Sequence, residues 1–408
     1  MAEPSIPPGF DFTDPDLCAC RVPARELAEL RRAAPVWWNA QARGSSGFDD
    51  EGYWAVTRHS DIVEISRSSE LFGSWQNTAI IRFGEQATRD SIEMQRLILL
   101  NIDPPEHTKL RGIVARGFNP RAIGSLREAL TARAERIVQA ALAGGTGDFV
   151  TDVACELPLQ AIAELLGVPQ EDRRKIFEWS NAMIGYDDPE FADEGAAAAG
   201  EMVGYAMQMA EDRRRCPRDD IVTKLVHAQV DGGQLSPDEF GFFMILLSVA
   251  GNETTRNAIS HGMLAFFDHP AQWELYRAER PDTAADEIVR WATPVTVFQR
   301  TAKADTVLGG QQIRTGDRVG LFYRSANFDE EVFADPDRFD IRRSPNPHLG
   351  FGGTGAHYCL GASLARLEIE LIFNAIADAL PAIRLAGEPR RLRSGWLNGI
   401  KHLPVSYA

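Results

Sequence analysis

The sequence lacks a long apolar run and an amino-terminal secretory signal. Its longest apolar stretch, FGFFMILLSVAG, covers residues 240–251, whereas a membrane-spanning helix needs roughly 20 residues. The opening segment, MAEPSIPPGFDFTDPD, contains neither the basic region nor the apolar region of a signal peptide. We therefore expect a cytoplasmic protein without a membrane span.

Basic charge and cysteine are also scarce. The chain has 43 Lys and Arg against 58 Asp and Glu, a formal net charge of −15, and this disfavours nucleic-acid binding because phosphate contacts need basic patches. Five scattered cysteines, an odd number, do not indicate a disulfide framework. With 44% apolar residues in 408, the chain can form a core large enough to enclose a cofactor.

What the sequence does contain is mostly helical periodicity. No internal repeat or low-complexity linker divides the chain, so we expect a single domain over residues 1–408. Apolar residues recur at helical spacing in the segments 23–35, 121–142, 156–166, 200–213, 271–279 and 282–292. Short alternating segments at 53–58 and between 305 and 323 predict strands.

One predicted helix is unusually long. Ser236 is a favourable N-cap, Pro237 fits the first helical position, and Glu239 completes a capping box. The pattern continues to residue 269, where a proline follows and must end it. At 1.5 Å per residue the helix spans roughly 50 Å, so we expect it at the centre of the fold. Its middle carries the polar segment AGNETT, residues 250–255.

The segment HLGFGGTGAHYCLGASLARLE, residues 348–368, allows two interpretations. Its glycines match the spacing of a dinucleotide-binding turn, but that turn needs a preceding strand and a nucleotide-binding half-domain around it. The preceding RRSPNP contains prolines that exclude a central strand, and too little chain follows. Leucines at helical spacing after Cys359 instead place this cysteine at a helix start, where the positive helix end favours a thiolate.

This loop and four further motifs resemble those of the cytochrome P450 family of haem-thiolate monooxygenases over essentially the full chain. The residues that match the haem loop are Phe351, Gly355, His357, Cys359 and Gly361. The usual loop has one residue fewer between its phenylalanine and its cysteine. The other matches are Glu287-x-x-Arg290 in DEIVRW, Arg338 in DPDRF, AGNETT in the long helix, and DPPEHTKLRGIVARGF over residues 103–118.

The resemblance implies a mainly α fold, a triangular helical prism with a smaller β-rich region. Haem b is then expected between the long central helix and the cysteine-loop helix, with Cys359 as the axial ligand of the iron. Further cofactor-binding residues implied by the family are His107, Arg111, Arg300 and His348 at the propionates, together with Ala250, Phe351, His357 and Gly361. Glu287, Arg290 and Arg338 are expected to support the loop structurally.

The resemblance also implies a reaction. Glu253 and Thr254 become the proton-delivery pair, although a mid-helix threonine often bonds its i−4 carbonyl and bends the helix. One oxygen atom of O2 is expected to enter an unactivated C–H bond. Because no flavin or iron–sulfur motif is present, electrons must come from outside the chain, and the resemblance implies a ferredoxin and its NAD(P)H-dependent reductase. Basic residues on the cysteine side offer a docking face, namely Arg342, Arg343 and Arg366.

A narrower similarity links segments such as GSWQNTAI, RWATPVTVFQRTA and RLRSGWLNGIKH to actinobacterial steroid side-chain monooxygenases, a group in which the longer haem loop also occurs. It implies terminal-methyl oxidation of cholesterol or cholest-4-en-3-one, with onward conversion to aldehyde and acid. The pocket residues expected by position are Ile80, Ile81, Phe83, Val249, Ala250, Val295, Val297, Phe298 and Trp396. Alternatives are an omega-hydroxylase of methyl-branched lipids, a peroxide-driven hydroxylase and a non-catalytic haem-thiolate sensor; the last two have less need of Glu253 and Thr254.

Overall fold

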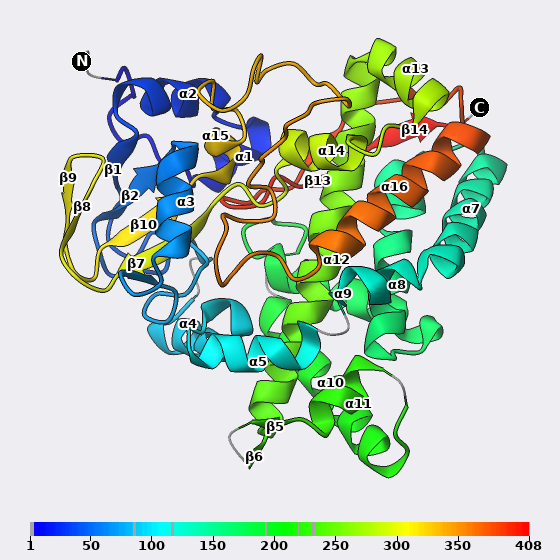
Figure 1. The fold of residues 1–408 in the computed structure, drawn as a ribbon, viewed down its shortest axis with the longest axis horizontal. Coiled ribbons are helices and arrows are strands. Elements are labelled where there is room, and N and C mark those ends of the chain that lie inside the picture. Colours follow the sequence, from blue (N-terminus) through cyan, green and yellow to red (C-terminus); the bar gives the residue numbers. More distant parts are fainter. Residues whose placement is uncertain are drawn as a thin grey trace.

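Helices form most of the structure, and the largest sheet lies at one side (Figure 1). The structure is a computed structural model and describes residues 4–84, 87–115, 118–191, 194–218, 220–230 and 233–407. The helices are α1 Pro15–Cys20, α2 Ala24–Ala33, α3 His59–Arg67, α4 Arg89–Met94, α5 Glu106–Ala115, α6 Pro120–Gly124, α7 Arg127–Gly144, α8 Glu156–Leu166, α9 Arg173–Ile184, α10 Gly195–Arg215, α11 Ile221–Val226, α12 Pro237–Asp268, α13 Pro270–Glu279, α14 Ala284–Ala292, α15 Tyr323–Ala326 and α16 Ala362–Ala379. Within the described ranges, no helix is long and apolar enough to cross a membrane.

The largest sheet has five strands in the order β1-β2-β10-β7-β3. Its strands are β1 Val36–Ala40, β2 Gly52–Val56, β3 Phe72–Gly73, β7 Phe298–Ala302 and β10 Arg318–Leu321. Neighbouring strands are antiparallel except β10 and β2, which run parallel. The smaller sheets comprise β4 Thr146–Asp148, β5 Gln229–Val230, β6 Gly233–Gln234, β8 Thr306–Leu308, β9 Gln311–Ile313, β11 Arg384–Leu385, β12 Arg390–Arg391, β13 Ile400–His402 and β14 Pro404–Ser406.

The long helix α12 passes through the middle of the molecule, with α16 beside it (Figure 1). Its start confirms the predicted capping box: Ser236 Oγ accepts a hydrogen bond from the Glu239 amide at 3.2 Å, and the Glu239 carboxylate accepts one from the Ser236 amide at 2.7 Å. The helix ends at Asp268, before the predicted proline. Because most of its residues are buried, α12 forms the spine of the main hydrophobic core.

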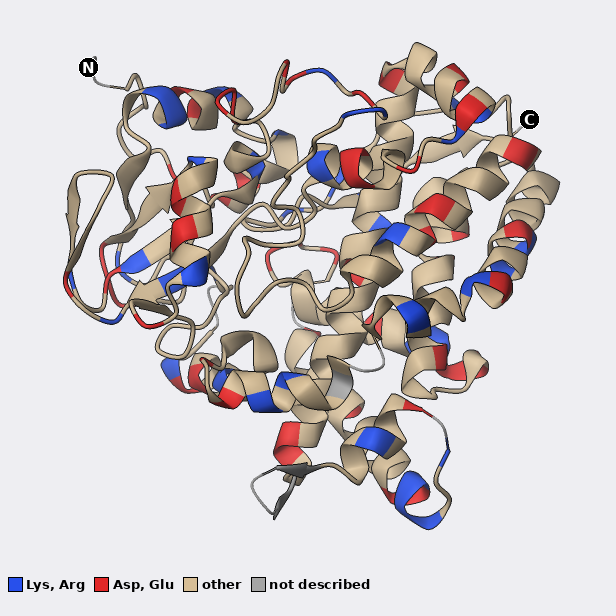
Figure 2. Cartoon of the chain, in the orientation of Figure 1, with Lys and Arg blue, Asp and Glu red and all other residues tan. Residues whose placement is uncertain are grey.

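Most predicted elements are present, with shifted ends. The helix predicted over 121–142 is divided into α6 and α7, because residues 125–126 interrupt the helical backbone. The strands predicted between 305 and 323 are the hairpin β8–β9 and the sheet strand β10. Outer helices such as α7 and α13 carry charges of both signs (Figure 2).

Candidate active site

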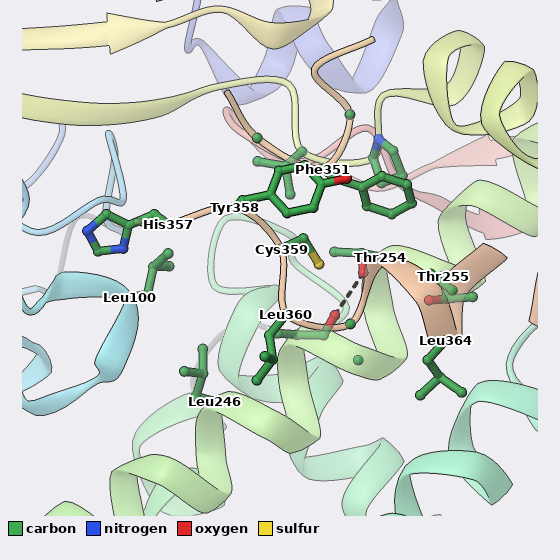
Figure 3. A pocket seen from close by; sticks show the side chains of 18 of the residues that line it. Leu100, Leu246, Thr254, Thr255, Phe351, His357, Tyr358, Cys359, Leu360 and Leu364 are labelled. Carbon is green, nitrogen blue, oxygen red and sulfur yellow. Dashed lines mark hydrogen bonds between the residues drawn. The ribbon is translucent and has the colours of Figure 1, made fainter. Parts of the chain in front are cut away.

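The cysteine loop, α16 and the middle of α12 enclose a cavity of about 240 Å³. A single water needs only about 10–15 Å³ by the same kind of measure, so the space suits a much larger group. Apolar side chains dominate its wall, and Figure 3 shows Leu100, Leu246, Leu360 and Leu364 around it. The cavity is therefore a candidate site for a flat or apolar ligand.

Cys359 lines this cavity just before α16 begins at Ala362, as the leucine spacing predicted. Burial raises the pKa of the Cys359 thiol, while hydrogen bonds from the amides of Gly361 and Ala362 and the positive charge of Arg111 act in the opposite direction. These donors and charges stabilise a thiolate. Burial is the larger effect, so the pKa of the thiol is raised; a cation bound at the sulfur inside the cavity would shift the balance toward the thiolate.

Two glycines let the loop fold tightly against the end of α3. Gly352 and Gly355 have φ angles of +89° and +109°. Residues other than glycine rarely adopt this backbone region. At Gly355 a Cβ would also overlap the carbonyl oxygen of Ser66. The glycines before Cys359 therefore allow the backbone of the loop to turn and to contact α3 closely.

A cationic cluster lies at one edge of the cavity. Arg111 and Arg300 both line it, and neither forms an ion pair with a carboxylate among the described residues. Arg111 donates a hydrogen bond to the carbonyl oxygen of Tyr358 at 2.6 Å, and Arg300 donates one to that of Gln299 at 2.7 Å. Arg300 is buried and Arg111 is half-buried, and cations removed from water without a carboxylate are costly, so this edge is suited to an anionic ligand.

Two histidines complete the cluster. The rings of His107 and His357 lie 4.3 Å apart between centroids, and the Nδ1 atom of His107 is buried without a partner in the described chain. Burial, reinforced by Arg111 and Arg300, lowers the pKa of His107 to about 4; burial, with Arg300 as the next cause, lowers that of His357 to about 2. Both rings are therefore neutral at pH 7 and can donate hydrogen bonds to an anion.

His348, which was predicted to join this cluster, lies elsewhere. Its Nε2 donates to Asp286 Oδ1 at 2.9 Å, its Nδ1 accepts from the Gly350 amide at 3.1 Å, and it does not line the cavity. The assignment of His348 to a propionate is therefore corrected. The physical reason is that both ring nitrogens of His348 are already bound within the chain, one of them by the Asp286 carboxylate on α14.

The middle of α12 faces Cys359 across the cavity. Ala250, Gly251, Thr254 and Thr255 line it, and Thr254 Oγ1 donates to the Ala250 carbonyl oxygen at 2.7 Å (Figure 3). This is the i−4 bond considered for the threonine. Glu253 does not line the cavity and is buried, with a close ion pair to Arg256 and a 2.9 Å hydrogen bond from Asn257.

Glu287 and Arg290 form an ion pair at 2.8 Å in which both side chains are 0% exposed. The third partner differs from the prediction. Arg338 is 63% exposed and bridges to Asp340, whereas Arg343, only 8% exposed, binds Glu287 at 3.1 Å. The Arg338 backbone still takes part, because its carbonyl oxygen accepts hydrogen bonds from Arg290 and Arg343. Arg343 therefore replaces Arg338 as the third side chain.

Of the predicted pocket residues, Val295, Phe298 and Ala250 line the cavity. The others, which are absent from its wall, pack in neighbouring apolar clusters: Ile80, Ile81, Phe83, Val249, Val297 and Trp396. The indole of Trp396 stacks behind Phe298 and donates to the Tyr186 hydroxyl at 2.7 Å.

Sequence reasoning missed several residues of the wall. They include Leu99 and Leu100 before α5, Phe243, Leu246 and Leu247 on α12, and Glu368 on α16. The α12 residues share one helix face at i, i+3 and i+4. That signal was hidden because α12 is apolar on most sides, so no face stood out in the sequence.

Comparisons with known proteins agree on one family. The family model described as cytochrome P450 matches residues 282–377. A steroid C26-monooxygenase of Rhodococcus jostii is 66% identical over 407 residues, which cover 100% of this chain and 86% of that protein. A methyl-branched lipid omega-hydroxylase of Mycobacterium tuberculosis is 42% identical, over 94% of this chain and 90% of that protein.

A solved structure shares the arrangement of the whole chain. The cytochrome P450 of Mycobacterium marinum in complex with pseudoionone superposes with a TM-score of 0.90 at 38% identity, covering 98% of this chain and 100% of that one. The prism of helices around a central long helix, expected from the sequence, is therefore shared with a protein of known structure.

Proposed function

The chain belongs to the cytochrome P450 family and is a monooxygenase, and we propose that its substrate is a steroid whose terminal side-chain methyl group it hydroxylates. The observation that carries this proposal is that Cys359 and Thr254 line one apolar cavity from opposite walls. The thiolate would hold the haem iron that activates O2, and the hydroxyl faces the space where an apolar molecule would be oxidised.

The residues around the cavity fit haem b. Cys359 would ligate its iron, and Arg111, Arg300, His107 and His357 would bind its two propionates through charge-assisted hydrogen bonds. When bound, haem activates O2 and supplies the oxidant for a C–H bond, with the second oxygen atom leaving as water. The unpaired Nδ1 of His107 and the two arginines without carboxylate partners support this assignment.

The residues of the chain position the reacting molecules, exclude water and supply protons. Ala250 and Gly251 have little or no side chain, so they leave room on the α12 side of the cavity for small molecules opposite Cys359. Thr254 Oγ1, held by the Ala250 carbonyl, is placed to hold a proton there. The buried carboxylate of Glu253 is the adjacent group that can replenish it. This pair favours an oxygenase over a peroxide-driven enzyme or a sensor.

The steroid assignment rests on the relatives and on the cavity wall. Relatives between 60% and 66% identical over the full chain are named steroid C26-monooxygenases, whereas the methyl-branched lipid omega-hydroxylases are 42% identical. The apolar wall suits a hydrocarbon side chain in either case. We therefore rank cholesterol or cholest-4-en-3-one first and methyl-branched lipids second, with alcohol, aldehyde and acid as successive products.

Electrons are proposed to come from a ferredoxin and its NAD(P)H-dependent reductase. Of the three arginines proposed for the docking face, Arg343 is buried at Glu287 and is therefore not available to a partner. Arg342 remains 53% exposed and Arg366 36% exposed beside the cysteine loop. Arg342→Glu is expected to raise the ferredoxin concentration needed for half-maximal turnover, while Arg174→Glu, on α9 and 83% exposed, should not. Equal behaviour of the two variants would point to another face.

The substrate class is tested by binding and by products. Cholest-4-en-3-one should shift the ferric haem of the purified enzyme from low to high spin, and turnover with ferredoxin should yield the terminal alcohol. A methyl-branched fatty acid run in parallel is the comparison. No spectral change with the steroid, together with a clear one for the branched acid, would reverse the ranking. Cys359→Ser should abolish the strongly red-shifted absorption of the reduced carbon monoxide complex.

A further inference from the structure

Arg366 lies beside the cysteine loop but outside the cavity. It belongs to α16, and it does not line the cavity wall. Its guanidinium carbon lies 4.5 Å from the centroid of the Phe351 ring, and a cation over the face of an aromatic ring is attracted to it. Phe351 in turn lines the cavity together with Cys359 (Figure 3). The phenylalanine therefore contacts both the cavity and a positive charge outside it.

The Asp286 carboxylate fixes Arg366 in this position. Its Oδ1 accepts hydrogen bonds from Arg366 Nε at 2.7 Å and from His348 Nε2 at 2.9 Å. Because Asp286 belongs to α14, these bonds join that helix to α16 and to the start of the cysteine loop. The side chains of Arg366 and Asp286 are 36% and 31% exposed, and ion pairs near the surface contribute little to stability. Stability alone therefore does not account for a guanidinium that is both paired and stacked on Phe351.

The charge of Arg366 acts on the sulfur of Cys359. Burial raises the pKa of the Cys359 thiol, and the positive charges of Arg111 and Arg366 are among the effects that oppose it. Arg111 lines the cavity, where a propionate would neutralise it. Arg366 is outside the cavity, and its ion-pair partner among the described residues is Asp286. The net charge that Arg366 presents to the sulfur therefore depends on Asp286.

We propose that Arg366 is a positioning residue for the redox chemistry, and that the Arg366–Asp286 pair sets the reduction potential of the bound haem through the charge beside Cys359. Groups around a metal ligand tune the potential of the metal, because they change the electron density of the ligand and the local field. The inference rests on the ligation of the haem iron by Cys359 proposed above.

The sign of the effect follows from the charges. One electron from the reductant converts ferric to ferrous iron, and no bond to the sulfur forms or breaks. The reduced unit carries one more negative charge, so a nearby cation stabilises it. Removing the charge of Arg366 should lower the midpoint potential, whereas removing that of Asp286 leaves Arg366 without its counter-charge and should raise it. Structural damage would not produce opposite shifts from the two halves of one ion pair.

The test is a spectroelectrochemical titration of the haem-loaded, substrate-free enzyme at pH 7. Arg366→Gln should make reduction about 3- to 10-fold less favourable, a shift of up to about 59 mV to lower potential. Asp286→Asn should shift the midpoint potential upward. Its amide oxygen can still accept a hydrogen bond from His348, so the packing around the carboxylate is largely kept. Shifts in the same direction, or no shift in either variant, would overturn the proposal.

Two further variants control for packing. Arg366→Lys keeps the charge and loses the planar group, so its potential should lie closer to wild type than that of Arg366→Gln. Arg127→Gln removes another arginine bound to α16, since Arg127 donates to Glu370 at 2.6 Å, and it should leave the potential unchanged. A potential of Arg366→Lys equal to that of Arg366→Gln would reject the electrostatic role. If Arg366→Gln fails to retain haem, Arg366→Lys and Asp286→Asn still carry the test.

The carbon monoxide complex of the reduced enzyme provides a second readout that does not depend on turnover. A sulfur with more electron density donates more strongly to the iron, which then donates more to carbon monoxide and weakens the C–O bond. The C–O stretching frequency should therefore fall in Arg366→Gln and rise in Asp286→Asn. Equal frequencies and equal potentials in proteins that all show the red-shifted absorption would reject the role of Arg366 alone. Absence of that absorption in wild type would reject thiolate ligation itself.

Discussion

The backbone amide of Cys359 donates a hydrogen bond to the carbonyl oxygen of Phe351, with 2.9 Å between nitrogen and oxygen. This bond closes the cysteine loop around its additional residue. The guanidinium carbon of Arg366 lies over the Phe351 ring, 4.5 Å from the centroid of that ring. The longer loop keeps the phenylalanine beside the cysteine because the extra length is taken up by the glycine-rich turn between them.

Gly355→Ala should damage this loop. The residue has φ +109°, and a Cβ would overlap Ser66, so we expect a loss of about 1–3 kcal/mol for backbone strain alone. Haem content per protein, measured after purification, should fall with it. Gly124→Ala, on α6 with no atom within 4 Å of the added Cβ, is the control and should keep full haem content.

The support under the loop should depend on Arg343 and not on Arg338. Arg343→Gln leaves Glu287 short of one buried cation, and breaking such a pair costs about 3–5 kcal/mol. Arg338→Gln removes an exposed side chain and should change stability by less than about 0.5 kcal/mol. Thermal unfolding of the two haem-loaded variants distinguishes them. A larger loss for Arg338→Gln would restore the assignment made from the sequence.

His261 should make the enzyme sensitive to acid. Burial, with Arg391 as the next cause, lowers the pKa of His261 to about 3, and its Nε2 donates to the Asn398 carbonyl at 2.9 Å. The unfolded chain takes up a proton at this histidine near pH 6.5 and the folded chain does not. The contribution of neutral His261 to the free energy of unfolding is therefore complete above about pH 6.5, and it is lost as the pH falls toward 3.

The measurement is the Tm of wild type and of His261→Gln at pH 7 and at pH 4.5. Between these two pH values the free energy of unfolding of wild type should fall by up to about 2–3 kcal/mol more than that of the variant, and its Tm should fall further. Each pH unit between the two pKa values is worth about 1.4 kcal/mol. Parallel loss in both proteins would show that other groups determine the acid sensitivity.

Thr254→Ala should separate electron consumption from product formation. The variant keeps Cys359 and the cavity but loses the Thr254 hydroxyl that lines the cavity. Protons are then no longer delivered from a fixed position. NAD(P)H oxidation is expected to continue while the product formed per NAD(P)H falls several-fold. The steroid-induced absorption change should persist as evidence of an intact site. Unchanged coupling would contradict the role given to Thr254.

Local sequence rules predicted the parts of the fold that depend on neighbouring residues. The capping box at Ser236 and Glu239 and the proline after residue 269 bounded α12 correctly, because helix ends depend on contacts within one turn. Cys359 was placed at a helix start by the leucines after it. The family motifs then indicated which residues to expect around it.

Partners that come from distant segments were predicted less well. Arg338 and Arg343 are five positions apart, and only the path of the chain decides which side chain reaches Glu287. His348 was expected to face an anion, but Asp286 binds it from α14. Trp396 and Ile81 are as apolar as Phe298, yet they pack behind the cavity wall.

The amino-acid order by itself determined the ends of the central helix and the position of the thiol at the start of α16, because these depend on short-range spacing, and the resemblance of its motifs to those of a known family indicated the class of chemistry. The tertiary structure alone decided which arginine joins Arg290 at Glu287 and which apolar side chains face the cavity. Those outcomes depend on how remote segments pack against one another, and burial and pairing are properties of the packed chain.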